Sequence, residues 1–394
     1  MPVALDQFLA PTDDEVLFGY PLRDRRPTAL PHRRERDPAA ALIDVVATLL
    51  DSSDPTLVEF SGGIDSSLVL SAATVAARRA GRPDPVPVTY RYTDAPATDE
   101  AAFQEVVVRS LNLREWRVFQ LTDEHDVVGP NALELLSEIG PILPGVLAGK
   151  AWSLAQLRGR SMLNGEGGDA VLGSRRITSS RVFLRHLRHG ELRPAVRRGR
   201  SLLRDLGPRP VRTRLIAADI RRQYGPPWLD EALRRDLSLL SSPEDAAEPL
   251  DPRRYFEYYL SLPGVWVPQH NARLVRAHFG VTLHSPLLHP DFVAVLAATV
   301  PRSRWINRSE LIARYFTSLL PAEIIERRSK AEFSDAYFAA HTRRFGRVWD
   351  GRGVPDRVDA RWLKEHWSSA DRIHGGSTIL LQRAALTAAS GDRS

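Results

Sequence analysis

One segment limits the possible folds of this chain more than any other: VEFSGGIDSSLVL at residues 58–70. In it, an apolar run passes through a glycine-rich turn straight into a second apolar run. The pattern predicts a strand, a tight loop and a helix. Backbone N–H groups at a helix start, with the helix dipole, favour phosphate, and glycines let the backbone approach a ligand closely. A carboxylate beside a phosphate needs a divalent cation between them, so Asp65 indicates magnesium. The residues predicted to form this site are Ser61, Gly62, Gly63, Asp65 and Ser66.

The loop is neither of two familiar phosphate-binding motifs. It lacks the G-x-x-x-x-G-K-[ST] spacing and lysine of a Walker A loop, and the G-x-G-x-x-G of dinucleotide folds. An ordinary turn before a helix is the alternative, because Ser, Gly and Asp are common in both. The loop resembles the S-G-G-x-D-S motif of the ATP pyrophosphatases, or PP-loop enzymes, which activate a carboxylate or carbonyl as an adenylate and release pyrophosphate. The resemblance implies that the chain binds ATP.

Strands and helices alternate around this loop. Gly81 is expected to end the second helix, Thr98 to cap the third, and residues 131–160 to be helical. Such alternation predicts an α/β fold with a parallel sheet, in which ligands bind at the carboxyl ends of the strands. The predicted helices are residues 39–50, 66–80 and 99–111, and the predicted strands are residues 58–60, 86–92, 116–121 and 160–164.

The chain divides into three predicted regions. Residues 1–38 are polar and rich in Pro and Arg, with a strand pair expected around Val16–Tyr20, and form an arm or a small subdomain. Residues 39–178 form the nucleotide-binding α/β core. Strand signals fade after it, so residues 179–394 are predicted to be mostly helical and to lie on the substrate side. An aromatic helix there, YFEYY at residues 255–259 with Trp266 nearby, predicts either ordinary core or one wall of a broad peptide cleft.

Composition excludes several classes of protein. The 394 residues contain no cysteine, which rules out disulfides, thiolate metal sites, Fe–S clusters and a catalytic thiol. No apolar run approaches the ~18 residues that span a bilayer, so a cytoplasmic enzyme without a membrane partner is expected. The net charge of +6 comes from scattered Arg, with Lys only at positions 150, 330 and 364. The basic stretch 181–222 is interpreted as a solvated helical segment rather than a nucleic-acid platform, although it is the best candidate for an acidic partner.

A second glycine-rich loop, NGEGGDAVLG at residues 164–173, follows its own predicted strand. Three glycines around two carboxylates suit a tight loop that presents Asp169 to a metal and Glu166 to a reacting group. Gly165 and Gly167 are the predicted nucleotide contacts. A solvated glycine turn explains either loop alone, but two such loops at strand ends favour function.

With both loops, residues 40–340 resemble the synthetase domain of the asparagine synthetase family, whose motifs are S-G-G-x-D-S and S/T-G-E-G-x-D-E. The resemblance implies that Asp65 and Asp169 bind Mg2+ and that Glu166 lies beside the activated carbonyl and the attacking amine. Ala170 departs from the family pattern, which has Glu there.

Two further segments carry the resemblance. LPAEIIERRSKAEFSD at residues 320–335 resembles the family's L-P-x-x-I…R-x-K-x-x-F-S, and Lys330 falls on its catalytic lysine, which stabilises charge during adenylation. GVTLHSPLLH at residues 280–289 resembles G-V-E-x-R-x-P-F-L-D. Its departures are Thr282, His284 and His289, which replace an acid, an Arg and an acid. A different carboxylate substrate is therefore expected.

These motifs do not identify the source of the attacking amine. Glutamine-dependent asparagine synthetases have a Cys directly after Met1, whereas this chain begins Met1-Pro2 and has no Cys, so it is expected to lack the glutaminase domain. Free ammonia is one source. A substrate amine is the other, as in β-lactam synthetase, carbapenam synthetase and the lasso-peptide macrolactam cyclases.

The β-lactam-forming enzymes have Tyr where Glu166 stands, whereas lasso cyclases resemble this chain in their G-E-G-G-D-type loop. The favoured hypothesis is therefore an ATP-dependent, AMP-forming ligase that closes an amide within a peptide precursor. A partner protease or leader-binding protein would fit that role. The alternatives are an ammonia-dependent or small-molecule amide synthetase, a PP-loop tRNA-modifying enzyme, which the missing cysteines disfavour, and a non-catalytic binding protein.

Overall fold

The computed structural model describes residues 7–34, 36–51, 54–172, 207–249, 251–299, 307–327, 331–369 and 373–391. The first part of the chain contains α1 (Asp13–Phe18), α2 (Pro38–Leu49), β1 (Leu57–Glu59), α3 (Ile64–Arg79), β2 (Val86–Tyr92), η2 (Pro96–Thr98), α4 (Ala101–Ser110), β3 (Arg117–Leu121), α5 (Pro130–Ile139), α6 (Val146–Gly149), α7 (Ala151–Ala155), β4 (Ser161–Leu163) and α8 (Gly168–Val171). The second part contains α12 (Arg209–Tyr224), α13 (Glu231–Ala246), α14 (Pro252–Ser261), α15 (Pro263–His278), β5 (Thr282–His284), η3 (Pro286–Leu288), α16 (Pro290–Thr299), α17 (Arg308–Tyr315), α18 (Ala322–Ile325), α19 (Ser334–Tyr337), α20 (Ala340–Val348), α21 (Ala360–Ser368), η4 (Gly375–Ser377) and α22 (Thr378–Gly391).

A five-stranded sheet in the order β3-β2-β1-β4-β5 forms the centre of the α/β fold, and all its strand pairs are parallel. Leu57 of β1 lies between Val86 of β2 and Met162 of β4. The chain runs from β1 outward to β3 and then returns to the other side of β1 for β4. This reversal makes a topological switch point between β1 and β4, where α/β sheets bind ligands. The predicted α/β class is confirmed.

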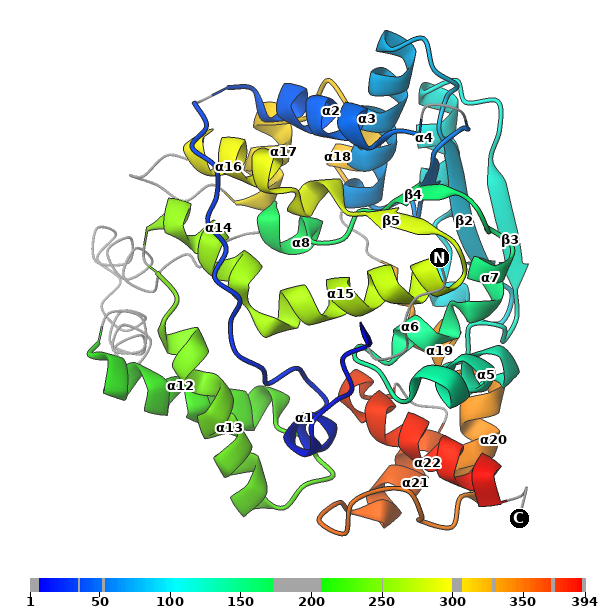
Figure 1. The fold of residues 1–394 in the computed structure, drawn as a ribbon, viewed down its shortest axis with the longest axis vertical. Coiled ribbons are helices and arrows are strands. Elements are labelled where there is room, and N and C mark those ends of the chain that lie inside the picture. Colours follow the sequence, from blue (N-terminus) through cyan, green and yellow to red (C-terminus); the bar gives the residue numbers. More distant parts are fainter. Residues whose placement is uncertain are drawn as a thin grey trace.

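Apolar side chains cover both faces of the sheet. One core joins β1 and β4 to α2, α3, α16 and α17, and includes Val58, Leu68, Leu163, Phe292 and Phe316. Across the sheet, Leu57, Val86, Val88, Met162 and Leu283 form a second cluster. A third core, around Trp228, Trp349 and Trp367, lies among α13, α20, α21 and α22, at the opposite end of the molecule from α2 and α3 (Figure 1). Helix α15 runs between these two ends (Figure 1).

The strand pair expected around Val16–Tyr20 is wrong, because these residues belong to α1 and the turn that ends it. A capping box starts the helix: the Thr12 hydroxyl accepts from the Glu15 amide, and the Glu15 carboxylate accepts from the Thr12 amide. Gly19, with φ 71°, ends it. A short apolar run fits either a strand or a buried helix, and the capping box decides for the helix here.

Three other details differ from the sequence prediction. Thr98 does not cap a helix, because its hydroxyl donates to the Ala95 carbonyl within η2 and α4 begins only at Ala101. Residues 131–160 form three helices, α5, α6 and α7, instead of one continuous segment. The fifth strand, β5, lies in the region that was expected to be mostly helical, and its register puts Leu283 beside Met162. The other predicted helices and strands of residues 39–164 are present within a few residues of their expected ends.

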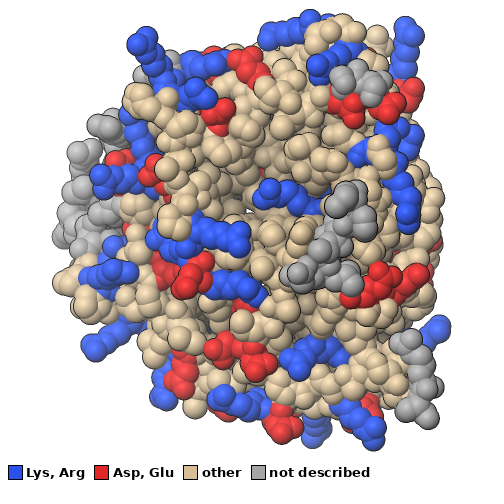
Figure 2. Space-filling model, in the orientation of Figure 1, with Lys and Arg blue, Asp and Glu red and all other residues tan. Residues whose placement is uncertain are grey.

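None of the helices in the described ranges combines the length and apolar character needed to cross a membrane. On the face drawn in Figure 2, the Lys and Arg side chains of the described residues are interspersed with Asp and Glu side chains. The basic stretch 181–222 lies partly outside the described residues, and its last part is helical, as predicted, in α12. The three-region division stays a prediction.

Candidate functional site

The first glycine loop connects β1 to α3, as predicted, and it lies at the switch point of the sheet. Gly62 has φ 87°, and a Cβ there would lie 2.9 Å from Cγ of Gln104, so both the backbone and the packing require glycine. Inside the loop the hydroxyls of Ser61 and Ser66 lie 3.1 Å apart, and Ser66 donates to the Gly63 carbonyl at 3.1 Å. These bonds fix the loop between β1 and the start of α3, and a helix start suits an anion.

The second glycine loop connects β4 to α8 and packs directly on the first. A Cβ at Gly165 would lie 2.8 Å from the Ser66 amide nitrogen, and one at Gly168 would lie 2.2 Å from Cγ of Asp65. Gly167 has φ 85° and touches Leu288. The glycines of this loop therefore permit the approach of the two loops, which brings Asp169 to the same end of the sheet as Asp65.

A methyl group at Gly168 is expected to displace the Asp65 carboxylate while leaving the fold intact. Gly168 lies in a helix, where alanine is a favourable residue, and the three atoms nearest to its Cβ would be those of the Asp65 carboxylate. We expect Gly168→Ala to lower Mg2+-dependent ATP turnover by about 10- to 100-fold. This is the usual effect of a change that shifts a metal-binding side chain, here the Asp65 carboxylate. Steady-state turnover and a thermal melt measure this. Gly391→Ala, in α22 with no atom near its Cβ, is the control. Equal turnover in both variants would contradict the expectation.

Arg308 joins the two aspartates. Its Nη2 donates to Asp65 Oδ1 at 2.6 Å and its Nη1 to Asp169 Oδ1 at 2.9 Å. The two carboxylates therefore share the Arg308 guanidinium. Among the described residues no group of three carboxylate or His side chains could hold a metal ion by itself. Magnesium, however, is commonly held by one or two carboxylates together with substrate phosphates, so the pair Asp65 and Asp169 fits Mg2+ bound with ATP.

Glu166 follows Asn164, whose side-chain oxygen accepts from the Glu166 amide at 3.3 Å. Its side chain lines the cavity and is exposed there. Desolvation by the surrounding protein raises the pKa of the Glu166 carboxyl. The positive charges of Lys150 and Arg276 lower this pKa, and the negative charges of Glu59 and Asp169 raise it further. A raised pKa suits a carboxylate that takes up a proton during a reaction near neutral pH.

A buried charge cluster forms the floor beside Glu166. Glu59, the last residue of β1, accepts from Lys150 Nζ and from Arg276 Nη2, the latter at 2.8 Å. Arg276 is 2% exposed. Burial alone would raise the pKa of Glu59, but Lys150 and Arg276 outweigh it and hold the pKa at about 2. Glu59 in turn holds the pKa of the Lys150 ammonium above its usual value despite burial. All three groups therefore stay charged.

A second layer of polar side chains supports this cluster. His125 is fully buried and lies between the Tyr92 hydroxyl at 2.7 Å and the Ser153 hydroxyl at 3.0 Å, and Ser153 donates to the Lys150 carbonyl. Burial and the nearby Lys150 lower the pKa of His125 to about 3, so this histidine is neutral. The network connects the backbone of Lys150 to β2.

Arg327 ties the segment that leads to Lys330 onto the first loop. Its Nη1 donates to the Gly62 carbonyl at 3.1 Å, and it forms a buried ion pair with Glu100. Lys330 itself lies outside the described residues. Arg327 and Ala331, which precede and follow residues 328–330, both line the cavity described next.

A cavity of about 730 Å³ brings these groups together at the carboxyl ends of β1 and β4. Of the predicted site residues in the described part of the chain, all but Gly62 line it: Ser61, Gly63, Asp65, Ser66, Gly165, Glu166, Gly167 and Asp169. Sequence reasoning missed Glu59, Glu100, Arg276, Arg308 and Arg327 as site residues, and noted Lys150 only for its rarity. A carboxylate inside an apolar strand was the available signal for Glu59. No sequence signal marked the arginines, because Arg is common throughout the chain.

The aromatic helix α14 belongs to the core, as one of its two predicted roles requires, and also reaches the cavity; the peptide cleft stays a prediction. Phe256 is fully buried in the main core, whereas Tyr259 lines the cavity. Of the three departures in the 280–289 segment, none lines the cavity, although their neighbours Leu283 and Ser285 do.

Comparison with known proteins agrees with this geometry. The family model described as asparagine synthase matches residues 37–376. No curated protein matches the chain. The matched segment contains both glycine loops, the cavity and the 320–335 segment, and it covers most of the 394 residues. The chain therefore belongs to the asparagine synthase family, and its activity is that of an ATP-dependent ligase that forms carbon–nitrogen bonds.

Proposed function

We propose that this enzyme activates a peptide carboxylate as an acyl-adenylate and closes an amide with an amine of the same peptide. The carboxylate oxygen attacks the α-phosphorus of ATP, the bond to the β-phosphate oxygen breaks, and pyrophosphate leaves. The amine nitrogen then attacks the acyl carbon, the acyl–oxygen bond breaks, and AMP leaves. The amine proton passes to Glu166.

The observation that carries this proposal is the convergence of both glycine loops and Glu166 on one cavity at the switch point. The start of α3 and the hydroxyls of Ser61 and Ser66 would bind the phosphates. Asp65 and Asp169 would hold Mg2+, which when bound neutralises phosphate charge. Lys330 would stabilise the charge that develops at the α-phosphate. The basic floor of Lys150 and Arg276 favours an anionic group near Glu166.

Two features favour a substrate other than aspartate. The charged residues that the family has in the 280–289 segment are replaced by Thr282, His284 and His289. The charges that line the cavity beside Glu166 are those of Glu59, Lys150 and Arg276. Retention of Glu166, where the β-lactam-forming enzymes have Tyr, favours a lasso-type macrolactam over a β-lactam.

Mass spectrometry of turnover mixtures tests the proposal. The purified protein, ATP and Mg2+ are incubated either with aspartate and ammonia or with a randomised peptide pool that carries one internal Asp or Glu. We expect peptides that lose one water as AMP accumulates. Conversion of aspartate to asparagine, with no dehydrated peptide, would contradict the peptide substrate but not the ligase chemistry.

Glu166→Gln is expected to separate the two half-reactions. The amide side chain keeps the shape of Glu166 but cannot take up the amine proton. Amide formation should therefore fall by about 10²-fold or more, while single-turnover pyrophosphate release is retained. Rapid-quench measurement of pyrophosphate and product checks this. A parallel loss of both steps would show that Glu166 does not act at the second step alone.

A further inference from the structure

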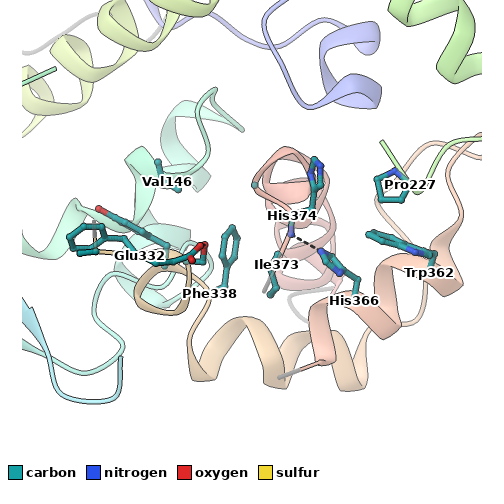
Figure 3. Close-up of a pocket in the computed structure, with 13 residues that line it drawn as sticks. Val146, Pro227, Glu332, Phe338, Trp362, His366, Ile373 and His374 are labelled. Atoms are coloured by element: carbon teal, nitrogen blue, oxygen red, sulfur yellow. Dashed lines mark hydrogen bonds between the residues drawn. The ribbon is translucent and has the colours of Figure 1, made fainter. Parts of the chain in front are cut away.

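A second cavity, of about 910 Å³, lies next to the candidate active site, and Figure 3 shows the residues that line it. Helix α21 contributes Trp362 and His366, and the segment before η4 contributes Ile373 and His374. The opposite wall comes from residues around α19, including Phe338. We call this cavity the aromatic pocket.

The aromatic pocket adjoins the candidate active site. Val146, Ala331, Phe333 and Tyr337 line both cavities. Tyr337 also stacks on His125, with ring centres 6.0 Å apart, and so packs against the polar layer beneath Lys150. A peptide whose reacting end lies at Glu166 would therefore pass these shared residues, Tyr337 among them, to place a side chain in the aromatic pocket.

The walls of the aromatic pocket are apolar and carry little charge. Of its lining residues in the described part of the chain, Glu332 is the sole carboxylate and none is Lys or Arg. His366 Nε2 accepts from the His374 amide at 2.7 Å, and His374 Nδ1 accepts from the Gly376 amide at 3.2 Å (Figure 3 shows the first bond). Each histidine thus uses one ring nitrogen as an acceptor, which a neutral imidazole provides. Trp362 stacks on His366, with ring centres 4.3 Å apart.

This chemistry suits an uncharged ring or branched alkyl group. Pockets of this size that are lined by aromatic side chains and a few polar groups typically bind apolar ligands and fix their orientation with the polar groups. A phosphate or a nucleic-acid backbone would find no cation among these described lining residues.

We propose that the aromatic pocket binds a bulky apolar or aromatic side chain of the peptide whose carboxylate is activated at Glu166. The inference rests on the proposed function and adds to it a rule for substrate choice. One large apolar residue, at a fixed distance in the peptide from the reacting acid, anchors the substrate and positions its carboxylate. Binding energy from such a remote group accelerates the chemistry by orienting the reacting atoms.

Gly375 offers a test that fills the pocket instead of emptying it. Gly375 lines the aromatic pocket, and a Cβ there would meet no atom within 4 Å. Gly375→Leu is therefore designed to narrow the pocket from a position where the added Cβ meets no neighbour. Gly391→Leu, at the end of α22 and also with open space at its Cβ, is the matched control. Trp362→Ala, which removes one wall, is the second variant, with a thermal melt to check its folding.

The measurement is sequencing by tandem mass spectrometry of the dehydrated products from a randomised peptide pool with one internal Asp or Glu. For the unmodified protein we expect products enriched in Phe, Tyr, Trp, Leu or Ile at one fixed offset from the acid. Gly375→Leu should lower the yield of these products by about tenfold or more, the usual effect of blocking one side-chain pocket, whereas Gly391→Leu should not. Affinity for ATP should not change in either variant.

Three outcomes would overturn the inference. Dehydrated products without any residue preference would do so, as would equal yields from Gly375→Leu and Gly391→Leu. Conversion of aspartate and ammonia alone would also overturn it, together with the peptide substrate. Absence of AMP release with both the peptide pool and aspartate would instead contradict the proposed function itself, so the two failures are distinguishable.

Discussion

Replacing Lys330 with alanine is expected to lower substrate-dependent pyrophosphate release by about 10²- to 10³-fold, the usual effect of removing one group that stabilises a transition-state charge. By family resemblance Lys330 is the catalytic lysine. The structure adds that Arg327 and Ala331, on either side of residues 328–330, line the active-site cavity and that Arg327 donates to the first glycine loop. The adenylation step, measured as ATP–pyrophosphate exchange, reports this loss directly.

Two further variants make the test specific. Lys364→Ala removes another of the three lysines, whose Nζ donates to the Trp349 carbonyl at 2.6 Å in a different core, and should leave exchange unchanged. Lys330→Arg keeps the charge but not the compact ammonium, so it should restore exchange only partly. An unaffected exchange rate in Lys330→Ala would remove Lys330 from the mechanism.

Glu59→Leu is expected to destabilise the fold by about 3–5 kcal/mol, since it leaves Lys150 and Arg276 as uncompensated charges in a buried site. That loss is a large part of the ~5–15 kcal/mol that keeps a typical domain folded. Urea denaturation measures it. The matched control is Glu105→Leu, which removes an exposed carboxylate that pairs with Arg109 at 3.6 Å, and about 0.5 kcal/mol or less is expected there. Equal stability of the two variants would contradict the account of the cluster.

The pH dependence gives the same cluster a second readout. The pKa of Glu59 is about 2 in the folded protein and that of an unpaired Glu about 4.5. Stability from this ion pairing is therefore present above the higher pKa and is lost as the pH falls through the lower one. The stability difference between the unmodified protein and Glu59→Leu should shrink steadily as the pH falls below about 4.5. A difference that stays constant with pH would mean that Glu59 is not charged in the fold.

The local order of elements was predictable because strand, loop and helix signals lie next to one another along residues 58–70 and 160–172. Such signals depend on near neighbours, and the α/β class followed from their repetition. The short strand β5 was not predicted. Its three residues lie within a segment that had been noted for its motif alone, and pairing with β4, far away in sequence, makes them a strand.

The active-site cavity was predictable only in part, because sequence signals depend on residues that are close along the chain. The two glycine loops carry their chemistry in contiguous residues, so the carboxylates Asp65, Glu166 and Asp169 stood out. Glu59 lies 91 residues from Lys150 and 217 from Arg276, and no local pattern connects them. Arg308 likewise reaches Asp65 across 243 residues. Contacts over such separations depend on the assembled sheet and on α15 and α17, which sequence periodicity does not place.

The nucleotide product is the most direct test of the central claim, that the enzyme is an adenylating amide ligase. Phosphorus NMR of the turnover mixture, with the acid and amine substrates identified by mass spectrometry, distinguishes the phosphate species. The account predicts one AMP and one pyrophosphate for each amide formed. ADP and inorganic phosphate as the primary products would contradict it, because they would mean that the γ-phosphate, and not the adenylate, activates the carboxylate.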